Sequence, residues 1–147
     1  MKGYKKILVP LDGSVTSEGI LPEIEKLASA FKASICLLYV VPNLIFPGTM
    51  ETVVQYETIA EAFTKEGEEY LRKIEKRLKD KGFTVEGLLQ QGNEAQRILE
   101  QAGRADIDLI AMSTHGRSGV SHWLLGSVTE KIVRHATKPV LLVRSAL

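Results

Sequence analysis

The stretch M-S-T-H-G-R-S-G-V-S-H-W-L-L-G-S-V-T, at residues 112–129, decides the fold and the candidate site of this chain. It follows an apolar run that ends at Ala111 and precedes a helical pattern, so it predicts a connection between a strand and a helix. Its glycines, Gly116, Gly119 and Gly126, allow a backbone to approach an anion closely. The first N–H groups of the next helix would point at that anion, which makes the stretch a candidate phosphate cradle.

A capping pattern marks where the last helix is expected to begin. Ser127 and Glu130 fit the S-x-x-E capping box, which predicts that the helix starts at Ser127, immediately after Gly126. A helix that opens directly after a glycine suits phosphate binding. The same residues are also compatible with ordinary turn glycines and a serine that only caps, because short motifs match by chance.

Length and composition limit the classes of function. The 147 residues fit one domain, and the formal net charge of +1 supplies no overall field that would favour nucleic acid or an anionic membrane. The single cysteine, Cys36, lies in an apolar run and is expected to be a buried, inert thiol. The basic N-terminus has an apolar part too short for a signal peptide or a membrane span. We therefore expect a soluble cytoplasmic protein with no nucleic-acid and no membrane partner.

Five short apolar runs predict buried strands, at residues 7–9, 34–41, 83–90, 107–112 and 140–143. Proline is expected to end the first strand at Pro10 and the second at Pro42. The third run is more polar than the first two, which places it nearer an edge of the sheet.

Helical patterns alternate with these runs, at residues 20–31, about 58–81, 95–102 and from residue 127 onward. Pro22 requires the first helix to begin late or to be kinked, because proline is tolerated only in the first turn. Gly82 is expected to end the long second helix. The irregular segment before it, residues 43–55, is expected to be a surface loop or else a lid or partner surface.

This alternation predicts an α/β fold with a five-stranded parallel sheet that helices cover on both faces. In such sheets ligands bind beyond the carboxyl ends of the strands, where the strand order reverses. The loop at residues 11–17 and the loop at residues 112–126 both follow carboxyl ends. If the first and fourth strands are neighbours, the two loops face each other over one crevice.

Three separated motifs occur in order along the chain: K-K-I-L-V-P-L-D-G-S at residues 5–14, S-T-H-G followed after nine residues by G-S, and K-P-V-L-L-V at residues 138–143. Together they resemble the universal stress protein family over essentially the whole chain. The resemblance implies one domain over residues 1–147, with three α/β/α layers, strand order 3-2-1-4-5 and an adenine-nucleotide alpha-hydrolase-like fold.

One branch of that family binds ATP through the pattern G-x-x-G-(nine residues)-G-(S/T). Gly116, a nine-residue spacer, Gly126 and Ser127 fit the pattern, whereas Ser113 stands in place of the first glycine and puts a side chain near the expected sugar. The resemblance therefore implies ATP as a ligand. It also implies a divalent cation, Mg or Mn, held mainly by phosphate oxygens and water.

The resemblance also implies three groups of binding residues, carried over position by position. The group that borders adenine comprises Pro10, Asp12 and Val40. The group that borders ribose and phosphates comprises Met112, Ser113, His115 and Gly116. The group that holds the triphosphate comprises Arg117, Gly126, Ser127, Val128 and Thr129. Ordinary alternatives exist, since an aspartate often orders a turn and a loop histidine is often solvated.

The family likeness favours a homodimeric, ATP-dependent regulatory module that acts in stress and contacts a protein partner the sequence does not identify. The subunits would pair through the last strand, V-L-L-V from Val140 to Val143. One alternative is an ATP hydrolase or phosphotransferase with slow turnover, for which His115 is the plausible general base. Another alternative is a dimeric adaptor that binds no nucleotide. Two other classes of protein share the layered architecture, and the sequence disfavours both. A phosphoacceptor receiver would need an aspartate at the end of the third strand, where this chain has Gln90. A flavodoxin would need a hydroxyl-rich phosphate loop after the first strand and aromatic residues around its flavin, and residues 11–17 supply only part of this.

Overall fold

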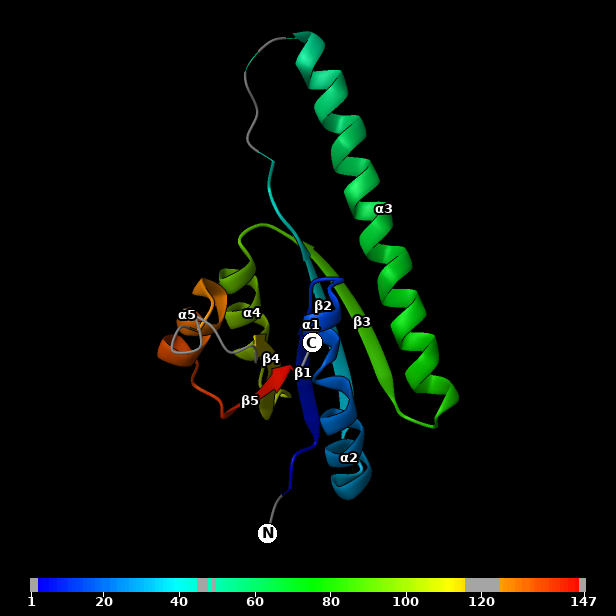
Figure 1. Ribbon diagram of the computed structural model, residues 1–147, viewed down its shortest axis with the longest axis vertical. Coiled ribbons are helices and arrows are strands. Elements are labelled where there is room, and N and C mark those ends of the chain that lie inside the picture. The colour runs from blue at the N-terminus through cyan, green and yellow to red at the C-terminus, as the bar shows by residue number, and fades with distance from the viewer. Residues whose placement is uncertain (1–2, 45–47, 49, 116–124, 146–147) are drawn as a thin grey trace.

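Five parallel strands form the central sheet of the computed structural model, which describes residues 3–44, 48, 50–115 and 125–145 (Figure 1). They are β1 (Lys6–Leu11), β2 (Ser34–Val41), β3 (Val85–Gln91), β4 (Leu109–His115) and β5 (Val140–Ser145). Their order is β3-β2-β1-β4-β5 and every pairing is parallel. The predicted fold class and strand order are confirmed, and the polar third strand lies at an edge.

Helices cover both faces of this sheet. The helices α1 (Val15–Glu18), α2 (Leu21–Phe31) and α3 (Met50–Asp80) lie on one face, while α4 (Glu94–Ala102) and α5 (Ser127–His135) lie on the other (Figure 1). Successive side chains of β1 pack on opposite faces of the sheet. Ile7 and Val9 belong to the core beneath α2 and α3, and Leu8 belongs to the core beneath α4 and α5. Both faces of the sheet are therefore buried, as continuous apolar strands require.

Two proline predictions have different outcomes. β1 continues to Leu11, so the expectation that Pro10 ends this strand is wrong. A proline is compatible with a strand where no ladder hydrogen bond needs its missing N–H group. Pro22 lies at the beginning of α2, whose first residue is Leu21, so this helix begins late. The missing N–H of Pro22 falls where a helix has no internal acceptor for it.

The long helix α3 begins earlier than predicted. It starts at Met50 rather than near Thr58, so the second half of the segment expected to be irregular is helical. Residues 50–57 contain neither proline nor glycine, and nothing in their backbone chemistry opposes the extension. The first part of α3 projects beyond the sheet (Figure 1). Within the described ranges, no helix is both long enough and apolar enough to cross a membrane.

Candidate functional site

The first and fourth strands separate near their carboxyl ends. They pair only through Ile7 with Leu109 and Leu8 with Ile110. The carbonyl of Lys6 accepts the Asp108 N–H at 2.9 Å on the β4 side. Backbone groups of every second residue face the same neighbour, so Pro10 also faces β4, where it has no N–H to donate. The ladder therefore stops at Pro10 and the sheet opens at the point where its strand order reverses.

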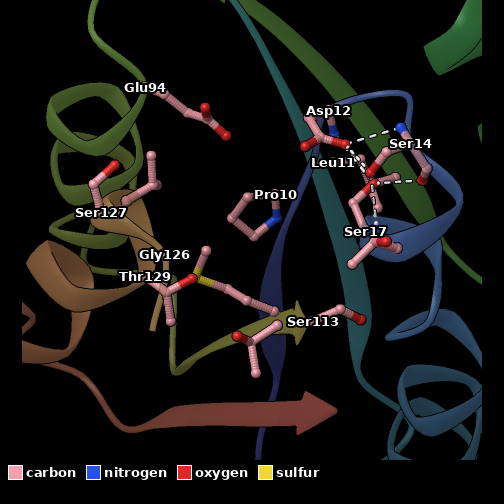
Figure 2. Close-up of a pocket in the computed structure, with 14 residues that line it drawn as sticks. Pro10, Leu11, Asp12, Ser14, Ser17, Glu94, Ser113, Gly126, Ser127 and Thr129 are labelled. Carbon is pink, nitrogen blue, oxygen red and sulfur yellow. Dashed lines mark hydrogen bonds between the residues drawn. The ribbon is translucent and has the colours of Figure 1, made fainter. Parts of the chain in front are cut away.

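A cavity of about 340 Å³ occupies this opening (Figure 2). Its wall comes from the segment after β1, between Pro10 and Ser17, from residues 112–114 of β4, from residues 126–129 at the start of α5, and from Glu94 of α4. The two segments predicted to face each other over one crevice therefore do so in their described parts. Ligands of parallel α/β sheets bind in this position.

The beginning of α5 faces the cavity without a side-chain cap. The helix starts at Ser127 as predicted, but its N-cap is Gly126 and no side chain caps it, so the predicted capping box is wrong. Glu130 forms an ion pair with Arg134 at 2.8 Å instead of reaching back to the N-cap. The first N–H groups of a helix have no internal acceptors, so here they can bind an anion.

Other helix ends at the same edge of the sheet are capped. The Ser14 hydroxyl accepts the Ser17 N–H at 3.1 Å at the start of α1. The Asn93 side chain accepts the Gln96 N–H at 3.0 Å at the start of α4. These caps satisfy N–H groups that α5 leaves available to a ligand.

Asp12 orders the turn after β1. Its Oδ1 accepts the backbone N–H of Ser14 at 2.9 Å and the Ser14 hydroxyl at 2.5 Å (Figure 2). Burial opposes ionisation of the carboxyl group, but hydrogen bonds from Ser14 and Ser17 outweigh it and lower the pKa of Asp12. Asp12 therefore remains ionised, and its carboxylate is held at the wall of the cavity.

Ser113, which replaces the first glycine of the family pattern, directs its hydroxyl toward Gly19. A Cβ added to Gly19 would lie 3.1 Å from the Oγ atoms of both Ser113 and Ser145. Both hydroxyls are buried, and neither has a hydrogen-bond partner among the described residues. Gly19 thus leaves the room that the extra side chain occupies, and the Ser113 hydroxyl points to the α1 side of the sheet.

The structure brings most of the predicted binding residues to one cavity, but it does not bring all of them. The wall contains Pro10, Asp12, Met112, Ser113, Gly126, Ser127, Val128 and Thr129. Val40 is not part of the wall, because it packs against the core beneath α4 and α5 and pairs with Gln90 of β3. The side chain of His115 and the whole of Gly116 and Arg117 lie outside the described residues.

Glu94 belongs to the cavity wall and was not among the predicted residues. It is the first residue of α4 and is half-buried. Burial, followed by the negative charge of Asp12, raises the pKa of Glu94. A carboxylate just past the third strand was visible in the sequence, at a carboxyl end where this fold binds ligands.

Known proteins of similar sequence identify the family. The family model described as the universal stress protein family matches residues 3–144. The chain belongs to this family. Universal stress protein MJ0531 of Methanocaldococcus jannaschii is 36% identical over 141 residues, which cover 96% of this chain and 82% of the relative. The three-layer architecture and the strand order agree with this membership.

Solved structures of universal stress proteins and of the related protein MJ0577 share the fold. The structure of MJ0577 has a TM-score of 0.77 and 31% sequence identity, over 97% of this chain and 96% of the other. A universal stress protein in complex with cAMP has a TM-score of 0.61 and 21% identity, over 98% and 99% of the two chains. At that lower identity the likeness concerns the fold alone.

Proposed function

We propose that this universal stress protein is a regulatory protein that binds ATP in the cavity between β1 and β4. The observation that carries the proposal is the uncapped start of α5, which faces the ionised Asp12 across an opening of the sheet. The N–H groups of the first turn supply the donors and the dipole that a phosphate chain needs. The acceptors at Asp12 suit the hydroxyl or amine donors of a nucleoside.

The chemistry of the cavity fits an adenine nucleotide. Its volume of about 340 Å³ lies within the range of small-molecule sites, about 300 to 1,000 Å³. Gly126 leaves the mouth of α5 open, because no described atom lies within 4 Å of the position of an added Cβ. Pro10 and Met112 add apolar surface against which a base can pack. The cAMP complex of a universal stress protein with this fold is consistent with such a ligand.

The residues of this chain would divide the work of binding. Asp12 would orient the nucleoside, and the backbone of Gly126, Ser127 and Val128 would bind the phosphates. Among the described residues no group of three or more His, Cys, Asp or Glu side chains could hold a metal ion. A Mg or Mn ion would therefore be held mainly by phosphate oxygens and water.

Assembly as a cytoplasmic homodimer belongs to the same proposal. β5 is an edge strand, and its residues Val140, Leu141, Leu142 and Val143 are only half-buried in a single chain. Pairing with a second β5 would cover these side chains and the free edge. The nucleotide would then change how the dimer contacts a protein partner.

Isothermal titration with ATP and magnesium tests the proposal. We expect one nucleotide per chain, and a temperature of unfolding that rises with ATP concentration as linkage requires. Absence of both heat and thermal shift would leave the nucleotide-free adaptor as the better description. Release of phosphate that stops in a His115→Ala variant would instead favour the hydrolase.

A further inference from the structure

Glu94 is a half-buried carboxylate in the cavity wall, and no described residue binds it. It makes no hydrogen bond and no ion pair within the described part of the chain. Figure 2 shows its side chain extending from α4 toward the cavity, on the opposite side from Asp12 in this view. A carboxylate in such a position loses hydration without gaining a partner, and this loss is unfavourable.

The position of Glu94 at the start of α4 does not fully explain why a carboxylate without a described partner is half-buried there. A carboxylate in the first turn interacts favourably with the helix dipole. Asn93 already caps α4, however, and burial together with Asp12 still raises the pKa of Glu94. No described side chain compensates for the surroundings of this carboxylate, and a hydrogen-bond donor on a ligand would.

The charges of the cavity limit what that partner can be. The described wall contains the carboxylates of Asp12 and Glu94 and no lysine, arginine or histidine. An ionised carboxylate only accepts hydrogen bonds and repels phosphate. A ligand group that lay against Glu94 would therefore be a hydrogen-bond donor, and phosphates would lie at the start of α5 instead.

Given the nucleotide site proposed above, we infer that Glu94 determines which nucleoside the cavity accepts. Its carboxylate accepts a hydrogen bond from a donor on the nucleoside, which is either the exocyclic amine of the base or a ribose hydroxyl. Both are neutral donors that a carboxylate binds strongly. Glu94 would thus add selection to a site whose glycine motif recognises only phosphates.

The test compares ATP with analogues that each lack one donor. Purine riboside triphosphate has hydrogen in place of the exocyclic amine, while 2′-deoxy-ATP and 3′-deoxy-ATP each lack one ribose hydroxyl. Dissociation constants are measured by titration calorimetry for the wild type, Glu94→Ala and Glu94→Gln. Glu100→Gln is the matched control, because Glu100 lies on the same helix and pairs with Arg97 outside the cavity.

The wild type should bind one of these analogues about 10- to 150-fold more weakly than ATP, as expected for a hydrogen bond to a charged group. Glu94→Ala should weaken the binding of ATP and bring the ratio of the two dissociation constants, analogue to ATP, close to one. Glu94→Gln should keep part of the ratio, because its amide oxygen is still an acceptor. Glu100→Gln should behave as the wild type does. The analogue that the wild type rejects identifies the donor.

Unchanged ratios in Glu94→Ala, in a protein that binds ATP, would overturn this inference and leave the proposed function in place. A loss of ATP affinity in Glu94→Ala that disappears when magnesium is left out would also overturn the inference, because the carboxylate would then act through the cation. A wild type that binds none of the nucleotides would overturn both proposals.

Discussion

Gly126→Val separates nucleotide binding from folding at the start of α5. The backbone of Gly126 has φ −59°, which any residue adopts, and no described atom lies within 4 Å of an added Cβ. Valine is a poorer N-cap than glycine, so we expect the unliganded variant to lose no more than about 1 kcal/mol of stability. The added side chain occupies the space in front of the first N–H groups, where a phosphate would bind.

The loss of affinity follows from the hydrogen bonds that the side chain would block. One hydrogen bond to a charged group contributes about 1.5 to 3 kcal/mol, which corresponds to roughly 10- to 150-fold in the dissociation constant. Titration calorimetry with ATP and magnesium measures this loss, and circular dichroism confirms folding. Gly48→Val is the control, since a Cβ there also meets no described atom within 4 Å. Wild-type ATP affinity in a folded Gly126→Val variant would refute the phosphate cradle.

Three further predictions concern single side chains. Ser127→Ala should change the unliganded free energy of unfolding by less than about 0.5 kcal/mol, because Ser127 does not cap α5; a loss of about 0.5 to 2 kcal/mol in urea titration would restore the capping role. Ser145→Ala should raise the stability by about 1 kcal/mol, because it removes a buried hydroxyl that lacks a partner in the described residues; a lower melting temperature would contradict this. Glu94→Gln should stabilise the unliganded protein at neutral pH. The pKa of Glu94 is higher in the folded protein than in the unfolded chain, so the folded protein binds the proton more readily. The stability of the wild type therefore falls as pH rises from the ordinary pKa of glutamate through the raised pKa of Glu94. The gain should shrink below the ordinary pKa of glutamate, and a gain independent of pH would show that charge is not the cause.

The architecture was predictable because local pattern and family likeness agreed. The buried runs at β1, β2 and β5 were continuous and bounded by turn residues, and the motifs fixed the strand order. The start of α3 was misplaced because helix boundaries are the least certain feature of a pattern. Residues 50–57 contain no strong signal for either helix or loop.

The parts of the site that could be predicted are those that lie within one continuous stretch of sequence. The turn at Asp12 and the opening of α5 each lie in one motif, and the structure brings them together. The cap of α5 was misassigned because the S-x-x-E pattern does not determine whether the serine or the preceding glycine occupies the N-cap. Glu94 was missed because its approach to Asp12 depends on how α4 packs over β1 and β2, which no local pattern contains.

The nucleotide content of the purified, gently handled protein tests the central claim most directly. The protein is denatured, and the released small molecules are separated and identified. Binding of ATP at the cavity between β1 and β4 predicts that ATP is released from the wild type and is lost from Gly126→Val. No released nucleotide from the wild type, together with no thermal shift on addition of ATP and magnesium, would contradict it.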